Sequence, residues 1–125
     1  KTKMALCVLH LDLLWRLVLV ILSNNIEIKN EAIAYNLKRL TNQIYKLLPN
    51  REENIDWQTP LSTIVEEFAG MSRLMPKQQE NIFPLLCKLE GLHSLTGEDD
   101  FFQYRRTIFE CLNLIQILKD SIEEE

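Results

Sequence analysis

Residues 4–22 read MALCVLHLDLLWRLVLVIL, and this stretch decides how the rest of the chain is interpreted. On a helical wheel with 100° per residue, Asp12 and Arg16 lie on one narrow stripe, and the rest of the circumference is almost entirely apolar. A surface helix has the opposite pattern, an apolar stripe on a polar cylinder. The sequence therefore predicts a first helix that lies either at the centre of a bundle or in lipid.

The hydropathy of this stretch does not decide between those two environments. Nineteen residues are enough to cross a bilayer core. Asp12 and Arg16 each cost about 2.5–3.5 kcal/mol on the insertion scale, and the Leu, Val and Ile residues return roughly 4–7 kcal/mol. The four amphipathic segments that follow each need a core, so we favour a central helix. A membrane-associated domain anchored by residues 4–22 stays as an alternative.

Asp12 and Arg16 are four residues apart, so they share one face of the predicted helix and can pair. The simplest interpretation is an intrahelical ion pair, solvated or half-buried. The alternative is that the pair marks an interface groove. For this reason we include Asp12 and Arg16 among the candidate interaction residues.

The composition is that of one globular domain spanning residues 1–125. Apolar residues make up 46% of the chain, and only three glycines and four prolines are present, which favours helices over turn-rich β structure. Charge is uneven: residues 1–51 hold eight Lys and Arg against three Asp and Glu, whereas residues 52–125 hold six against fifteen. This asymmetry predicts either attraction between the two halves or a basic face in the first half.

Three cysteines lie far apart, each among apolar residues of a predicted helix: Cys7, Cys87 and Cys111. An odd number without close pairs is typical of reduced, buried thiols and indicates a cytoplasmic protein. Metal sites need closely spaced ligands, and none occur. We therefore predict no metal and no cofactor.

The second predicted helix runs from Asn25 or Asn30, both credible caps, to about residue 48. Its apolar residues follow a heptad-like spacing: Ile26, Ile33, Leu37, Leu40, Ile44 and Leu47. Pro49 and Asn50 are expected to end it, followed by a loop over residues 51–59. In that loop we expect Ile55 and Trp57 to tuck against the core. The alternative is that Trp57 is an exposed anchor, since Trp is enriched at binding hot spots.

Three further helices are expected over residues 60–74, 76–95 and 99–122. Thr59 and Pro60 form a strong start signal for the first of them, in which Gly70 could permit a close helix crossing. Pro84 must kink the second or mark a new start after Asn81. Gly97 is expected to be its C-terminal cap.

The last helix is broader in its apolar pattern than one neighbour can cover. Its main stripe is widened by four further apolar residues: Phe102, Phe109, Leu114 and Ile117. This predicts that the helix is either deeply packed or lies at a dimer interface. Arg105 and Arg106, near its start, are expected to pair with the acids at 98–100 or with other Glu residues; the alternative is that they bind a carboxylate on a partner.

The sequence lacks the patterns that carry most enzymatic chemistry. Three scattered glycines cannot form a nucleotide-binding loop, and no nucleophile elbow or zinc-protease motif is present. Glu66 and Glu67 are adjacent, so they diverge by about 100° and cannot act as a catalytic pair. We predict no catalytic residues.

The prediction is an all-α, single-domain bundle of about five helices with a highly apolar, central first helix. Its expected role is that of a non-enzymatic protein-interaction module (adaptor, regulator or assembly subunit) that binds another protein or a second copy of itself. A nucleic-acid-associated protein using a basic face of the second helix is an alternative. The candidate interaction residues are Asp12, Arg16, Lys38, Arg39, Trp57, Arg105 and Arg106.

Overall fold

A computed structural model describes residues 29–124, and within that range the chain is all-α, as predicted. The chain divides into two units, residues 1–33 and residues 34–125. Of the first unit, residues 29–33 are described, and they are helical. The predictions for residues 4–22, including the central position of the first helix and the Asp12–Arg16 pair, lie outside the described residues. So do Cys7 and the start of the second helix.

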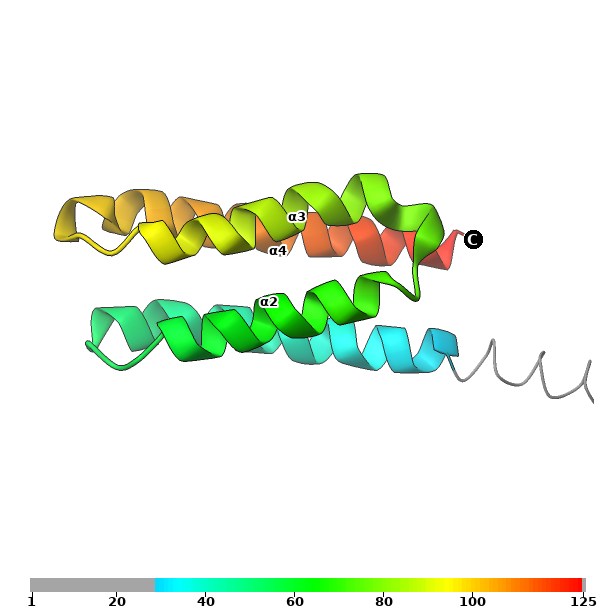
Figure 1. Ribbon diagram of the computed structural model, residues 1–125, viewed down its shortest axis with the longest axis horizontal. Coiled ribbons are helices and arrows are strands. Elements are labelled where there is room, and N and C mark those ends of the chain that lie inside the picture. Colours follow the sequence, from blue (N-terminus) through cyan, green and yellow to red (C-terminus); the bar gives the residue numbers. More distant parts are fainter. Residues whose placement is uncertain (1–28, 125) are drawn as a thin grey trace, which may run out of the picture. The chain divides into compact units, whose positions relative to one another are not determined.

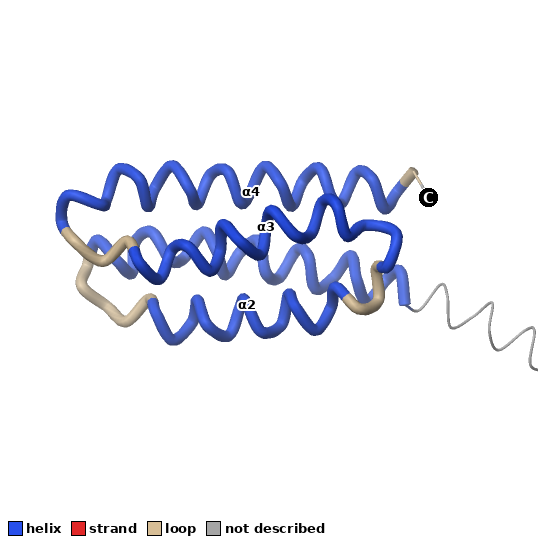
Figure 2. Tube along the Cα trace, turned by 45° about the horizontal axis from the view of Figure 1, so that its top comes forward, coloured by secondary structure: helices blue, strands red, loops and turns tan. Residues whose placement is uncertain are grey.

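The described part of the second unit is an up-down-up-down arrangement of four helices (Figures 1 and 2). The first of these four helices passes through residues 34–52 and corresponds to the second predicted helix. From here on, the first helix means this helix of residues 34–52. It is followed by α2 (Gln58–Ser72), α3 (Gln79–Gly91) and α4 (Phe101–Glu123). Short 3-10 turns precede and follow α3 at Pro76–Gln78 and Leu92–Ser94, and a third, Glu98–Asp100, precedes α4. Short loops of this kind place consecutive helices side by side and antiparallel.

Each helix buries the stripe that its spacing predicts. The fully buried side chains include Leu37, Leu40, Ile44 and Leu47 of the first helix, Leu61, Ile64 and Phe68 of α2, Ile82, Leu85 and Leu89 of α3, and Tyr104, Ile108, Cys111 and Leu118 of α4. Spacings of three and four residues keep these side chains on one face of each helix. Removing a buried aromatic ring such as that of Phe68 would cost about 3–5 kcal/mol.

Pro49 was predicted to end the second predicted helix. That prediction is wrong, because this helix, the first of the four described, continues through residue 52. Pro49 removes one N–H donor, but its own carbonyl still accepts a bond from the N–H of Glu53 at 3.0 Å. The helix ends instead at Asn54, which has a positive φ of 58°. The N–H of Ile55 bonds the carbonyl of Asn50, and that of Asn54 bonds the carbonyl of Arg51, as in a Schellman motif.

The loop between the first helix and α2 is therefore shorter than predicted, and its side chains are less buried. Ile55 is 50% exposed, so its predicted tucked position is wrong. Trp57 is half-buried. Asp56, which the sequence analysis did not single out, accepts the N–H groups of Gln58 and Thr59 at 3.0 and 3.2 Å. Asp56 thereby caps α2 in place of the predicted Thr59.

Two predicted roles for glycine are also wrong. A Cβ added to Gly70 would have nothing within 4 Å, so Gly70 does not mark a close helix crossing. Gly97 has an extended backbone with φ −81°, and its N–H donates to the Asp100 carboxylate at 3.0 Å. It begins the turn before α4 and does not cap the segment before it. The acids at 98–100 occupy the first turn before α4, where the helix dipole favours them.

Pro84 lies inside α3, so the alternative of a new helix start after Asn81 is wrong. Glu66 is exposed, whereas Glu67 is half-buried and pairs with Arg39. Cys111 is buried as expected, whereas Cys87 is exposed, contrary to the prediction. Cys87 lies outside the stripe of α3 that Ile82, Leu85 and Leu89 occupy.

Candidate interaction surfaces

The outward side of α4 carries large apolar side chains that no described residue covers. Phe102 is 76% exposed, Phe109 42% and Ile117 50%. The prediction that α4 is deeply packed on all sides is therefore wrong for these residues. Burying a Phe or Ile side chain is worth roughly 1.5–3 kcal/mol, so leaving three of them exposed on one helix forgoes a considerable stabilisation.

We define the outer α4 face by its exposed residues on that side of the helix: Phe102, Arg105, Arg106, Phe109, Asn113, Gln116, Ile117, Asp120, Glu123 and, directly after α4, Glu124. At 100° per residue these positions lie within a stripe about 120° wide. The stripe is opposite the buried side chains of α4, among them Ile108, Cys111 and Ile115.

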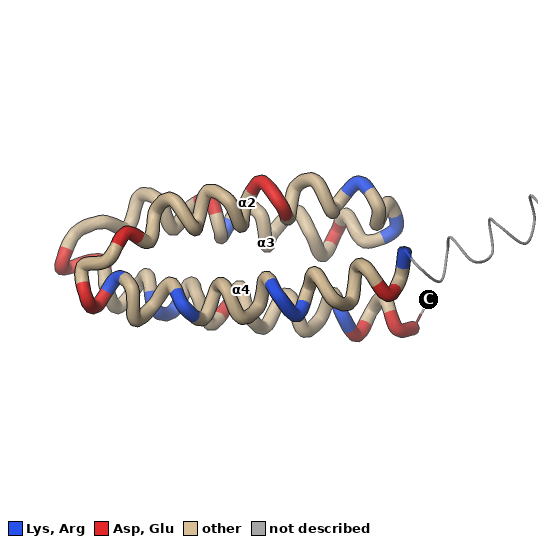
Figure 3. The backbone as a smooth tube through the Cα atoms, turned by 90° about the horizontal axis from the view of Figure 1, so that it is seen from below, with Lys and Arg blue, Asp and Glu red and all other residues tan. Residues whose placement is uncertain are grey.

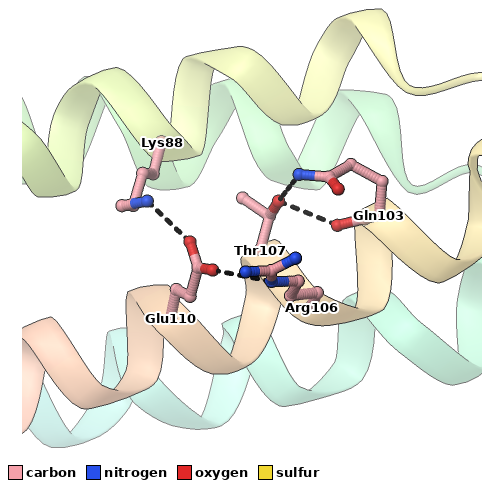
Figure 4. Close-up of polar contacts among 5 residues, drawn as sticks. All are labelled: Lys88, Gln103, Arg106, Thr107 and Glu110. Atoms are coloured by element: carbon pink, nitrogen blue, oxygen red, sulfur yellow. Dashed lines mark hydrogen bonds and ion pairs between the residues drawn. The ribbon is translucent and has the colours of Figure 1, made fainter.

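Two arginines lie within this face, and each contacts a neighbour along the helix. The guanidinium carbon of Arg105 lies 5.7 Å from the centroid of the Phe109 ring. Arg106 donates from Nε to Glu110 at 3.2 Å (Figure 4). The predicted pairing of these arginines with other Glu residues is thus confirmed for Arg106.

Glu110 also joins α4 to α3. Its other oxygen accepts a bond from Lys88 Nζ at 2.6 Å (Figure 4). The bond from Lys88, assisted by the charges of Lys88 and Arg106, holds the pKa of Glu110 below its ordinary value. Because Lys88 alone can neutralise Glu110, Arg106 is able to turn toward another carboxylate without leaving Glu110 unpaired.

Charge changes sign along the outer α4 face. Its N-terminal half holds Arg105 and Arg106, and its C-terminal end holds Asp120, Glu123 and Glu124; the acidic C-terminal end is visible in Figure 3. The last turn of α4 contains no basic residue. This order opposes the helix dipole, which favours cations at the C-terminus and anions at the N-terminus.

The basic face that was predicted for the second predicted helix, now the helix of residues 34–52, is present in part. Lys38 and Lys46 are exposed, and Tyr35 and Tyr45 beside them are 69% and 52% exposed. Arg39 is engaged elsewhere, since it donates to Glu67 of α2 at 2.6 Å. It therefore fastens the first helix to α2, and the exposed basic charge of this face is carried by Lys38 and Lys46.

Trp57 belongs to an aromatic cluster around Arg51 at one end of the bundle. Its ring meets that of Tyr104 edge to face, with centroids 4.9 Å apart. The guanidinium carbon of Arg51 lies 4.7, 5.3 and 5.8 Å from the ring centroids of Tyr104, Phe101 and Trp57. Trp57 thus packs against Tyr104, in line with its expected tucked position, and this position does not support the alternative role of an exposed binding anchor.

Arg51 fastens the end of the first helix to the segment between α3 and α4. It donates to the carbonyl oxygens of Leu95 and Gly97, both at 2.9 Å. A cleft of about 470 Å³ lies beside it and is lined by residues of the loop around Trp57 and by residues 96–98. Because the guanidinium is already engaged by two carbonyls and three rings, the cleft has little free positive charge to offer a ligand.

Two buried polar atoms in this cluster have no hydrogen-bond partner among the described residues: Arg51 Nε and the Tyr104 hydroxyl. Burial raises the pKa of Tyr104 far above its ordinary value, and the nearby charge of Arg51 only partly opposes this. The hydroxyl is therefore neutral at all physiological pH values. Its environment is that of a core side chain.

The described residues offer little reactive chemistry. Burial raises the pKa of the Cys111 thiol to about 12, so it is not a nucleophile at neutral pH. Within residues 29–124, no group of three or more His, Cys, Asp or Glu side chains could hold a metal ion. No helix in the same range is long and apolar enough to cross a membrane.

The structural roles of Arg51 and Asp56 were not predicted from the sequence, where Arg51 counted only toward the basic face; both act through contacts with groups outside their own helical stripe. Asp56 could have been recognised as a cap, because it stands three residues before Thr59 at the start of an amphipathic segment. Arg51 had no such local signal, since its two carbonyl acceptors are 44 and 46 residues away.

A scan against protein-family models found no match for this chain, and neither did searches of curated proteins and of solved structures.

Proposed function

We propose that this protein is a non-enzymatic, cytoplasmic helical interaction module and that the outer α4 face is its binding surface. The observation that carries this proposal is the exposure of Phe102, Phe109 and Ile117 on one side of α4. Aromatic side chains and arginines are enriched at the centres of protein–protein interfaces, and this face combines both.

The neighbouring charges support the same role. Arg105 lies against the ring of Phe109, and Arg106 is 65% exposed in its side chain. A guanidinium that is both stacked and exposed can donate to a carboxylate on a partner at little cost in side-chain entropy. The face therefore has an apolar centre with polar groups around it, the usual anatomy of an interface.

Site-specific photocrosslinking in the native cell tests this proposal. A benzoylphenylalanine would replace Phe109 in one variant and Phe83, which is 69% exposed on α3, in the matched control. We expect a light-dependent covalent adduct with a protein at position 109 and none at position 83. No adduct at position 109, or equal adducts at both positions, would contradict the proposal.

A second candidate function is association with nucleic acid through the first helix. The exposure of Lys38 and Lys46 together with Tyr35 and Tyr45 favours it, because basic charge interleaved with aromatic rings suits phosphate and base contacts. This candidate predicts binding to a mixed oligonucleotide that weakens steeply with salt. Binding that is unchanged in the Lys38→Glu/Lys46→Glu variant would reject it.

A further inference from the structure

We infer that the outer α4 face binds the same face of a second copy of this chain, with the two α4 helices antiparallel. This inference rests on the proposed function, because it names the partner of the surface proposed above. Two features of α4 support it: the order of charges along the outer α4 face and the spacing of the residues in that face.

The charges of the face are complementary to themselves only when one helix is reversed. Basic residues lie in the N-terminal half of α4, and acidic residues lie at its C-terminal end. A parallel second copy would place arginine opposite arginine and glutamate opposite glutamate. An antiparallel copy places each basic half opposite an acidic end, which is the arrangement that electrostatic complementarity requires.

The spacing places the complementary residues on matching lines of the helix. Arg105 and Glu123 are separated by five whole helical turns at 3.6 residues per turn, so their side chains leave α4 in the same direction. The same holds for Arg106 and Glu124. In a two-fold arrangement, side chains on the same edge of the face meet across the interface, so Arg105 of one copy meets Glu123 of the other.

A two-fold axis near Asn113 also aligns the apolar residues. In that arrangement Phe109 of one copy is level with Ile117 of the second copy, and Arg106 is level with Asp120. Arg105 is level with Ser121, about 3 Å along the helix axis from Glu123, a distance that the long arginine side chain can span. Each of these pairs occurs twice, as a two-fold interface requires. Two copies of Asn113 meet at the centre, where a polar pair can fix the alignment of two helices.

The antiparallel copy also explains the unfavourable order of charges within one α4. Acids at a helix C-terminus are disfavoured by the helix dipole. In the pair, each acidic C-terminus lies beside the arginines of the other copy. Arg106 can join this contact because Lys88 remains on Glu110 at 2.6 Å.

Charge reversal on the full chain tests the inference. The variant Arg105→Glu/Arg106→Glu makes the face wholly acidic, and the variant Asp120→Arg/Glu123→Arg leaves Glu124 as the single acidic residue of the face. We expect the wild-type chain to sediment as a dimer and each variant alone to dimerise at least about 100-fold more weakly, because like charges then face each other. Mixed in equal amounts, the two variants should form a dimer again.

The control variant Lys38→Glu/Lys46→Glu carries the same change in net charge as the acidic variant but lies on the first helix, and it should dimerise as the wild type does. Recovery in the mixture shows that both variants are folded, so misfolding cannot imitate the expected result. A wild-type chain that is monomeric at about 100 µM, or a mixture that does not dimerise although both variants keep wild-type helical circular dichroism, would overturn the inference.

The proposed function and this inference fail separately. An adduct at position 109 with a different protein, together with a monomeric wild-type chain, would leave the proposed function standing and overturn the inference. The absence of any adduct together with a monomeric chain would overturn both.

Discussion

Tyr104 and Arg51 show how far single residues depart from what their types suggest. Tyr104 is fully buried, yet its hydroxyl has no partner among the described residues. Arg51 is a basic residue near the end of a helix, yet its guanidinium donates to two carbonyl groups and contacts three aromatic rings within the fold. Both residues stabilise the end of the bundle by packing, and neither is free to bind a ligand.

The Tyr104→Phe substitution is expected to leave stability unchanged or to raise it by about 1 kcal/mol. A buried hydroxyl without a partner carries a desolvation cost of about 1–3 kcal/mol, which the substitution removes while the ring remains. Urea unfolding followed by circular dichroism measures the difference. A loss of more than about 1 kcal/mol would mean that the hydroxyl is hydrogen-bonded in solution.

The Arg51→Lys substitution is expected to destabilise the fold by about 1.5–3 kcal/mol. Lysine keeps the charge, but it cannot reproduce a planar guanidinium that donates to two carbonyls and lies on aromatic rings. The Lys46→Arg substitution, on the exposed side of the same helix, is the control and should have little effect. Urea unfolding of both variants would measure the contrast, and equal stabilities would count against the role of Arg51.

At the scale of elements, the cap of α2 gives the stability of the fold a dependence on pH. Hydrogen bonds from the Thr59 hydroxyl, and from the backbone N–H groups of Thr59 and Gln58, lower the pKa of Asp56 below its ordinary value of 3.8. Because the pKa is lower in the folded state than in the unfolded state, Asp56 stabilises the fold above about pH 4. That stabilisation is lost as the pH falls through the lowered folded-state value.

The Asp56→Ala variant is therefore expected to have a lower melting temperature than the wild type at pH 7, and the difference should be smaller at pH 2, where the carboxylate loses its charge. The Asp56→Asn variant retains a capping oxygen without the charge, so it should keep most of the stability at pH 7. Thermal unfolding monitored by circular dichroism at both pH values measures these differences. A difference between wild type and Asp56→Ala that is as large at pH 2 as at pH 7 would show that the carboxylate charge does not contribute to the stability of α2.

Periodicity predicted the described helices well and their ends poorly. The stripes from Leu37 to Leu47 and from Tyr104 to Leu118 are buried as their spacing predicts, because the spacing that places these side chains on one face is set within the helix itself. The residue at which a helix ends depends on caps and contacts outside its own apolar stripe. Pro49 was expected to end its helix, but the end is set by Asn54 with its positive φ, a conformation that the sequence indicates only weakly.

The candidate site was predictable only in part for the same reason. The breadth of the apolar pattern on the last helix indicated either deep packing or an interface, and the exposure of Phe102, Phe109 and Ile117 speaks against deep packing of these three side chains. The separate roles of the basic residues were not predictable. Arg39 pairs with a glutamate 28 residues away, whereas Lys38 next to it is exposed, and only the packing of two helices distinguishes them.

At the scale of the whole molecule, the fold leaves one side of α4 uncovered by the described residues. Among residues 29–124, four helices bury their main apolar stripes against one another. A second face of α4, with apolar and charged side chains, stays exposed. A helix with two such faces is suited to pack twice, once within its own chain and once against another molecule. The central claim is that Phe109 and its neighbours on the outer α4 face make the second contact, with the same face of a second copy of the chain.

Sedimentation equilibrium of the full chain and two single variants tests this claim most directly. Phe109→Asp places a charge at the centre of the outer α4 face, and Phe83→Asp places the same charge on an exposed phenylalanine of α3. The account predicts twice the chain mass for the wild type and for Phe83→Asp, and the mass of a single chain for Phe109→Asp. A wild-type monomer, or a Phe109→Asp variant that stays dimeric, would contradict it.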